Sequence, residues 1–200
     1  SGTIGSDFVA KSPPDGHTVM ITANSFVMTA ALYRTLPFDP VQDFTAIGEV
    51  ARGRLALVAH PALGVTSLAE LVALAKQRPG QLDYASPGNG TPHHLAMELL
   101  KQSAGIDVVH VPYKGSSGAV NDVIGGQVPM MIMPLSIALP YLASGRLRVL
   151  AVSGDQRSPL APEVPTFREG GIENYDIDLW YGLLAPARTR DALSDVSIAI

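Results

Sequence analysis

The fold is decided by residues 82–95, which read LDYASPGNGTPHHL. Residues 82–85 have the pattern of a short buried strand, and the two glycines that follow allow the backbone to turn sharply. Thr91 suits the N-cap of a helix, where its hydroxyl can accept a backbone hydrogen bond, and Pro92 suits the first helical position. The stretch therefore predicts a strand, a glycine-rich turn and a helix in direct succession.

The same succession repeats through the middle of the chain. Short apolar runs predict further strands at 108–111, 128–133 and 147–152. Helices that end at Gly or Pro are expected at 67–78, 92–103, 117–124 and 136–143. Alternating strands and helices imply right-handed βαβ crossovers, so we expect an α/β fold with mainly parallel sheets and flanking helices.

Less regular elements surround this block. We expect helices at 3–11, 26–33 and around 166–169, and strands at 17–22, 44–50, 55–59 and 179–185. The last two strands bracket the regular block, which is the pattern of a lobe inserted between two crossing strands. The sequence thus predicts a second lobe at 61–180 between hinge strands at 55–60 and 179–186, and a first lobe made of 1–60 and 181–200.

Composition limits the classes of function. The chain has 200 residues, a formal net charge of −4 and no cysteine, so nucleic acid is not an expected partner and thiol chemistry is excluded. Prolines interrupt the most apolar stretch, and no window reaches the roughly 20 uninterrupted apolar residues of a membrane helix. Because neither an initiator Met nor a signal peptide opens the sequence, we expect the start to be a processed or truncated end.

The turn at residues 86–91 is the main candidate site. Free backbone N–H groups and the positive end of the helix dipole there can hold an anion at the carboxyl edge of the sheet, where open α/β sheets bind ligands. The alternative is an ordinary glycine-rich turn with a helix cap. His93 has the position of a solvated first-turn residue, whereas His94 can bond back to the turn or reach a ligand.

Other junctions repeat this pattern. Tyr113 could line a cleft, and Ser116 or Ser117 is expected to cap the next helix. Ser136 is expected to cap a third helix in the same way. In the first block, the turn at 24–25 ends a strand and could reach a ligand from the opposite lobe.

Motifs of catalysis are absent from the sequence. There is no Walker motif and no HExxH pair, and the segment GSSG at 115–118 misses the nucleophile elbow GxSxG by one position. His93 and His94 are adjacent, so on a helix they cannot share a metal ion. We therefore expect no enzyme activity, no metal site and no cofactor.

The chain resembles the substrate-binding proteins of tripartite tricarboxylate transporters, often called Bug receptors. Motifs of this family occur in order along nearly the whole chain: GTIG at 2–5, PDGHT at 14–18, SPGNGTPHHL at 86–95, HVPYKG at 110–115, GQV at 126–128, SGRLRVLAV at 144–152, PEVPT at 162–166 and WYGLLAP at 180–186.

The resemblance implies a two-lobed fold of the type II periplasmic-binding-protein kind. It also implies a periplasmic receptor, functional as a monomer, that closes on a small carboxylated solute and passes it to a membrane permease. The turn at 24–25 and the loop at 86–91 are expected to contact the ligand, in part through ordered water.

The chain departs from the family at both ends. A first strand and a Pro-Gly-Gly loop are missing at the start, and ARTR at 187–190 replaces an expected Gly-Thr-Pro. We therefore expect truncation at both ends and an incomplete first lobe.

The predicted ligand contacts are Asn24, Ser25, Ser86, Gly88, Asn89, Gly90, Thr91, His94, Tyr113 and Ser136. Two other functions remain open at this point. One is the effector-binding domain of a transcription regulator, and the other is a small hydrolase that uses His94 with a serine.

Overall fold

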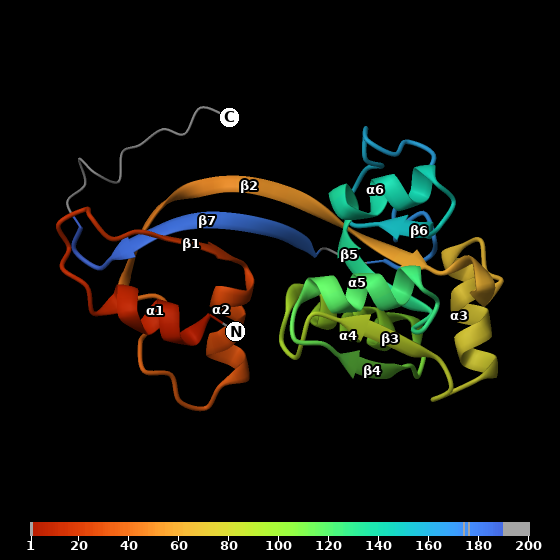
Figure 1. Cartoon of the computed structure of the whole chain (residues 1–200), viewed down its shortest axis with the longest axis horizontal. Coiled ribbons are helices and arrows are strands. Elements are labelled where there is room, and N and C mark those ends of the chain that lie inside the picture. Colours follow the sequence, from red (N-terminus) through yellow and green to blue (C-terminus); the bar gives the residue numbers. More distant parts are fainter. Residues whose placement is uncertain (1, 174, 176, 190–200) are drawn as a thin grey trace. The chain divides into compact units, whose positions relative to one another are not determined.

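The computed structural model describes residues 2–173, 175 and 177–189 (Figure 1). The chain forms two compact units: unit 1 comprises 1–52 and 179–200, and unit 2 comprises 53–178. These bounds are similar to those of the predicted lobes, 1–60 with 181–200 and 61–180. That the two parts act as lobes which close on a ligand stays a prediction. Residues 190–200 of the predicted first lobe lie outside the described residues.

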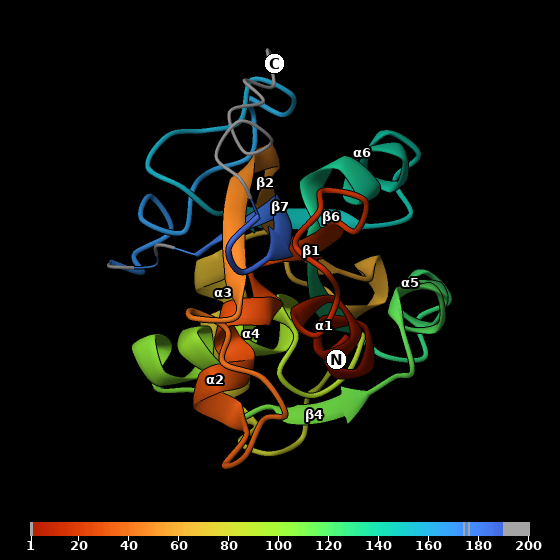
Figure 2. The same ribbon diagram turned by 90° about the vertical axis from the view of Figure 1, so that its left-hand side faces the viewer.

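Unit 1 is a small sheet with two helices on one side (Figures 1 and 2). Strand β1 (Met20–Ala23) pairs antiparallel with β7 (Asp178–Pro186), and β7 lies next to β2 (Phe44–Ala59). The helices are α1 (Thr3–Ala10) and α2 (Ser25–Leu32). Three buried aromatic rings form the centre of the unit, and Phe44 meets both Phe26 and Phe38 edge to face.

Strand β2 corrects one prediction. The sequence predicts separate strands at 44–50 and 55–59, but the structure has one strand from Phe44 to Ala59. The polar residues between the two apolar runs lie on exposed parts of the strand, where Arg52 pairs with Glu49 at 2.8 Å. A strand with a solvated side tolerates such residues, so their charge does not mark a turn.

Unit 2 contains a five-stranded sheet in the order β6–β2–β5–β3–β4. Its other strands are β3 (Asp83–Ser86), β4 (Val109–Pro112), β5 (Met130–Pro134) and β6 (Arg148–Val152). Strand β3 is parallel to β4 and β5, while β2 is antiparallel to β5 and β6. Hence β3 to β6 all run in one direction and β2 alone is reversed, which confirms the predicted α/β class.

Helices cover both faces of this sheet. They are α3 (Leu68–Gln77), α4 (Pro92–Ala104), α5 (Ser116–Ile124) and α6 (Leu135–Ala143), with a short 3-10 helix at Pro61–Leu63. Helices α5 and α6 pack on the face that carries Ala85 and Met131. Side chains alternate along a strand, so Tyr84 points to the opposite face, where its hydroxyl donates to Glu98 of α4.

The structure confirms some helix ends and corrects others. Ser67 caps α3 and Thr91 caps α4, as predicted. In contrast, Gly115 and Pro134 occupy the N-caps of α5 and α6, and neither makes a side-chain cap bond. The predicted serine caps, Ser116 or Ser117 and Ser136, are therefore wrong, because each helix starts immediately after the preceding turn or strand and takes these serines into its first turn.

The predicted helix around 166–169 is also wrong. Residues 167–171 form turns, and Thr166 makes a parallel bridge to Val152. Glu169 accepts from the backbone N–H of Thr166 at 2.7 Å, which closes a local turn in place of a helix. Among the described residues, no helix combines the length and apolar character needed to cross a membrane.

Candidate functional site

The candidate site of unit 2 lies at the carboxyl edge of β3, β4 and β5. Because these strands are parallel, they end at the same edge, and α4, α5 and α6 begin there. The first turn of each helix carries backbone N–H groups without helical partners and the positive end of the helix dipole. This edge of the sheet is therefore suited to a negatively charged ligand group.

The loop between β3 and α4 has a shape that only glycine allows. Gly88 has φ +141° and Gly90 has φ +72°, and a Cβ atom at Gly88 would lie 3.2 Å from the carbonyl oxygen of Tyr113. The N–H of Gly88 donates to Oγ of Ser86 at 3.1 Å, and the hydroxyl of Thr91 donates to the carbonyl of Gly88 at 2.8 Å. These local hydrogen bonds thus fix the loop in a shape that lets a ligand come close to its backbone.

Two amide donors of the loop remain available. Within the described part of the chain, the N–H groups of Asn89 and His93 have no hydrogen-bond partner. The N–H of His94 is occupied, because it donates to Oγ1 of Thr91 at 3.4 Å, and Pro92 has no N–H. Unpartnered backbone N–H groups at the start of a helix are donors of the kind that bind anions.

The rings of Tyr84, His94 and His110 form a cluster next to this loop. The His110 ring is stacked on Tyr84, with centroids 4.8 Å apart, and the His94 and His110 centroids are 4.2 Å apart. Nε2 of His110 is 2.6 Å from Oγ of Ser86, which is fully buried. Nδ1 of His94 accepts from the N–H of Gly90 at 3.3 Å.

The cluster lowers the basicity of its histidines. Burial, as the largest cause, lowers the pKa of both His94 and His110. Lys101 also lowers both pKa values, whereas Glu98 raises them. Glu98 is itself held by the Tyr84 hydroxyl and by Lys101 at 2.9 Å. Both imidazoles are therefore neutral near pH 7.

His93 differs from its predicted position in solvent. The residue is partly buried, and its Nδ1 atom is buried with no hydrogen-bond partner among the described residues. Burial lowers the pKa of His93 to about 4. The expectation of a solvated first-turn residue is therefore wrong, because the ring is partly buried and its Nδ1 atom is out of contact with solvent.

The predicted contacts fall into separate groups. Ser86, Gly88, Gly90, Thr91 and His94 come together in the loop. Asn89 is in the same loop, and its side chain is exposed.

The other predicted contacts lie elsewhere. Burial, together with the hydrogen bond that the Tyr113 hydroxyl donates to Asp122 of α5, raises the pKa of Tyr113 to about 12. Ser136 is exposed in the first turn of α6. Asn24, which is buried, and Ser25 lie at the start of α2 in unit 1. The ligand contacts of all these residues stay predictions.

Tyr84 and His110 were not among the site residues predicted from the sequence. The sequence contained a signal for Tyr84, because side chains alternate along a strand and this places Tyr84 and Ser86 on the same face of β3. The parallel register then puts His110 beside Tyr84. Without the register, which sequence does not reveal, the three residues could not be joined.

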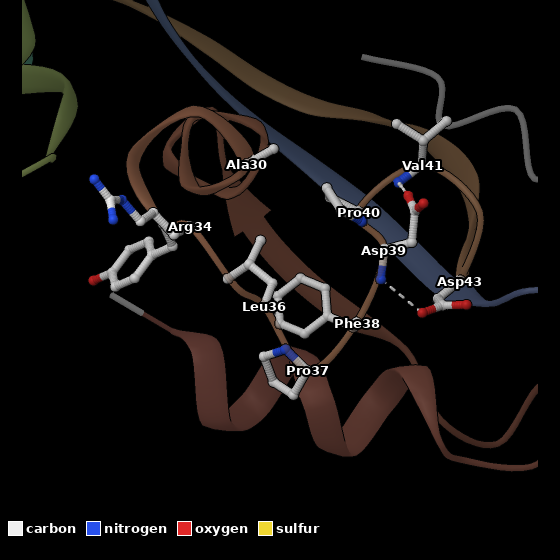
Figure 3. A pocket seen from close by; sticks show the side chains of 10 residues that line it. Ala30, Arg34, Leu36, Pro37, Phe38, Asp39, Pro40, Val41 and Asp43 are labelled. Atoms are coloured by element: carbon white, nitrogen blue, oxygen red, sulfur yellow. Dashed lines mark hydrogen bonds between the residues drawn. The ribbon is translucent and has the colours of Figure 1, made fainter.

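Unit 1 has a separate open hollow of about 640 Å³ (Figure 3). Its lining includes Arg34, Leu36, Phe38 and the turn that starts at Asp39. The Asp39 side chain accepts from the N–H groups of Val41 and Gln42, so this carboxylate is occupied by its own turn. None of the predicted ligand contacts lines the hollow, and it is a weaker candidate for a ligand site.

Comparison with known proteins decides the family. Residues 1–196 match the model of the tripartite tricarboxylate transporter family receptor. The chain belongs to this family. Membership places it among receptors rather than enzymes, as the sequence predicts.

Two relatives are similar in sequence to this protein over nearly its whole chain. A protein from the tcbD-tcbE intergenic region of Pseudomonas sp. (strain P51) is 38% identical over 94% of the chain and 56% of its own length. The protein BugT of Bordetella pertussis is 35% identical over 94% of the chain and 58% of its own length. The chain thus spans a little over half the length of these relatives.

Solved structures of similar proteins share the fold. An R. palustris protein with adipate has a TM-score of 0.90 and 36% identity, over 96% of this chain and 65% of that protein. MatC from Rhodopseudomonas palustris, with bound malate, has a TM-score of 0.86 and 28% identity, over 96% of this chain and 66% of that protein. The periplasmic binding protein BugD has a TM-score of 0.87 and 29% identity, over 97% of this chain and 65% of that protein. The likeness confirms the predicted periplasmic-binding-protein fold.

Proposed function

We propose that the chain is the solute-binding part of a periplasmic receptor that captures a small carboxylate for a tripartite membrane transporter. The carboxylate is received by the loop at 86–91, where the N–H groups of Asn89 and His93 donate to its two oxygens. Gly88 and Gly90 keep side chains out of its path. The solute then passes unchanged to the membrane subunits.

The free amides of Asn89 in the loop and of His93 in the first turn of α4 are the observation that carries this proposal. Backbone donors at a helix N-terminus stabilise an anion without a buried Lys or Arg, which would carry a desolvation cost. The similarity to proteins that were solved with adipate and with malate supports a dicarboxylate as the ligand class.

Substitution of Gly90 by Val tests the site. The branched side chain narrows the approach to the loop and strains a residue at φ +72°. Gly145 has φ +68° and no atom within 4 Å of an added Cβ, so Gly145→Val is a control with the same backbone strain away from the loop.

The assay is the thermal shift of the intact gene product with adipate, malate, benzoate and the uncharged diamide of adipate. Saturating carboxylate, at about 100 times its Kd, should stabilise the wild-type protein and Gly145→Val by about 2.7 kcal/mol. Gly90→Val and the diamide should give no shift. If no carboxylate shifts the wild-type protein, or if Gly90→Val responds as the control does, the proposal fails.

Location and partners need a test in cells. We propose a periplasmic receptor that works as a monomer with a membrane permease. Fractionation should release the protein with the periplasm, and sedimentation should give the monomer mass. Deletion of the gene should abolish uptake of the carboxylate that the thermal-shift assay selects, and unchanged uptake would argue against the transport role.

A further inference from the structure

We propose that His94 and His110 are positioning residues that hold the loop at 86–91 in the shape that accepts an anion. His110 fixes the start of the loop through Ser86, and His94 fixes its end through Gly90. This inference rests on the proposed function of the loop. Beyond that function, it assigns a role to two side chains that need not touch the ligand. It also predicts that ligand affinity depends on pH.

The first link runs from His110 to Gly88. Ser86 is fully buried at the end of β3, and its Oγ atom lies 2.6 Å from Nε2 of His110 on the neighbouring strand. The same oxygen accepts from the N–H of Gly88 at 3.1 Å and lies 3.2 Å from the Gly88 carbonyl. One imidazole thus orients the hydroxyl that sets the turn at Gly88.

This first link tolerates protonation. A neutral His110 can accept from the Ser86 hydroxyl at Nε2, whereas a protonated His110 donates to the same oxygen. In the second case the Ser86 hydroxyl can donate to the Gly88 carbonyl, which is within reach. The contact between His110 and Ser86 therefore survives in both states with its direction reversed.

The second link runs from His94 to Gly90 and requires a neutral ring. The Gly90 N–H donates to Nδ1 of His94 at 3.3 Å, and a proton on Nδ1 removes the acceptor. The His110 ring is only 4.2 Å away between centroids, so two positive charges would also repel each other. Acid therefore releases Gly90 and disorders the loop.

The charged groups around His94 and His110 are consistent with neutral imidazole rings. Helix α4 presents Glu98 and Lys101, which carry opposite charges and bind each other at 2.9 Å. Strand β3 presents Tyr84, whose hydroxyl is occupied by Glu98. No carboxylate bonds directly to either imidazole among the described residues, so no ion pair holds the protonated form.

Variants that place a polar atom where one ring nitrogen lies can distinguish a positioning role from simple packing. Asn places an oxygen near the position of Nδ1, and Gln places a polar group near that of Nε2. His94→Asn and His110→Gln therefore keep the bonds to the loop without titrating, whereas His94→Leu and His110→Leu remove them. His60→Asn is the matched control, since Nδ1 of His60 also accepts a backbone N–H, that of Ala62 at 3.2 Å, away from the loop.

The first readout needs no ligand. Amide hydrogen exchange, corrected for intrinsic rates, should show protection of Gly88 and Gly90 at pH 7.5. Protection of Gly90 should fall at pH 5.5 in the wild-type protein but persist in His94→Asn. Gly88 should lose protection in His110→Leu and keep it in His110→Gln. Equal protection of both glycines in all variants would overturn the inference whatever the ligand is.

The second readout is the Kd for adipate, measured by calorimetry over the same pH range. From pH 7.5 to pH 5.5 the wild-type protein and His60→Asn should lose more affinity than His94→Asn. The excess loss should be less than about tenfold, because burial lowers the pKa of His94 from 6.5, and protonation of adipate itself affects all variants alike. Tighter binding at low pH would overturn the inference, because His94 would then act as a charge partner of the anion. If adipate and malate do not bind at all while the exchange pattern is as expected, the proposed function fails and the positioning role stands.

Discussion

Acid should destabilise the folded protein through His93. Burial lowers the pKa of this residue from 6.5 to about 4, so between these values the unfolded chain binds a proton that the folded chain does not. The stabilising effect of the neutral ring is therefore present above pH 6.5 and is lost as the pH falls toward 4. A decrease from about pH 7.5 to about pH 5 should cost the folded state about 2 kcal/mol through this residue alone.

Urea unfolding followed by circular dichroism at the two pH values measures this loss. His93→Gln removes the titration but keeps the backbone amide, so its free energy of unfolding should fall by about 2 kcal/mol less than that of the wild-type protein over the same pH interval. His94 and His110 also have lowered pKa values, but they contribute equally to both proteins and cancel in the difference. An equal loss in the two proteins would refute the assignment of a buried, neutral His93.

Substitutions at three further positions test the packing and the helix cap of unit 2 by chemical denaturation. Leu100→Ala should cost about 2–5 kcal/mol because Leu100 is fully buried in α4, and a loss below 1 kcal/mol would place this helix face outside the core. Tyr175→Phe should cost about 1 kcal/mol, since the buried Tyr175 hydroxyl donates to the carbonyl of Ala96 at 2.7 Å, and an unchanged stability would contradict that bond. Thr91→Ala should cost about 1 kcal/mol through the lost N-cap of α4, whereas Thr91→Ser should retain most of it, and equal losses in the two variants would argue against capping.

The sequence predicted most elements of unit 2, apart from the helix around 166–169, because local signals there agree with the fold. Thr91 and Pro92 mark the start of α4, and Gly105, at φ +62°, marks its end. The predicted serine caps are wrong because both helices begin earlier: Gly115 takes the N-cap of α5, and β5 leads directly into α6 with Pro134 at its N-cap. Residue type alone does not show where such a helix begins.

The residues of the candidate site could be predicted from the sequence only in part, for a different reason. The glycines and the cap of the loop are neighbours in sequence, so their shared role follows from local chemistry. The contact between Ser86 and His110 joins residues 24 positions apart and depends on the register of two parallel strands. Such register is set by packing of the whole sheet, which no short window of sequence contains.

The free donors of the loop belong to the main chain, and this has a consequence for how the protein can change over evolution. Every residue except proline supplies the same N–H, so Asn89 can be exchanged for almost any other residue without loss of the donor. The constraint falls instead on Gly88, where a Cβ would press on the Tyr113 carbonyl at 3.2 Å. In the proposed role of the loop, side chains around this turn can therefore vary and select different solutes, while the backbone donors to the shared carboxylate stay the same.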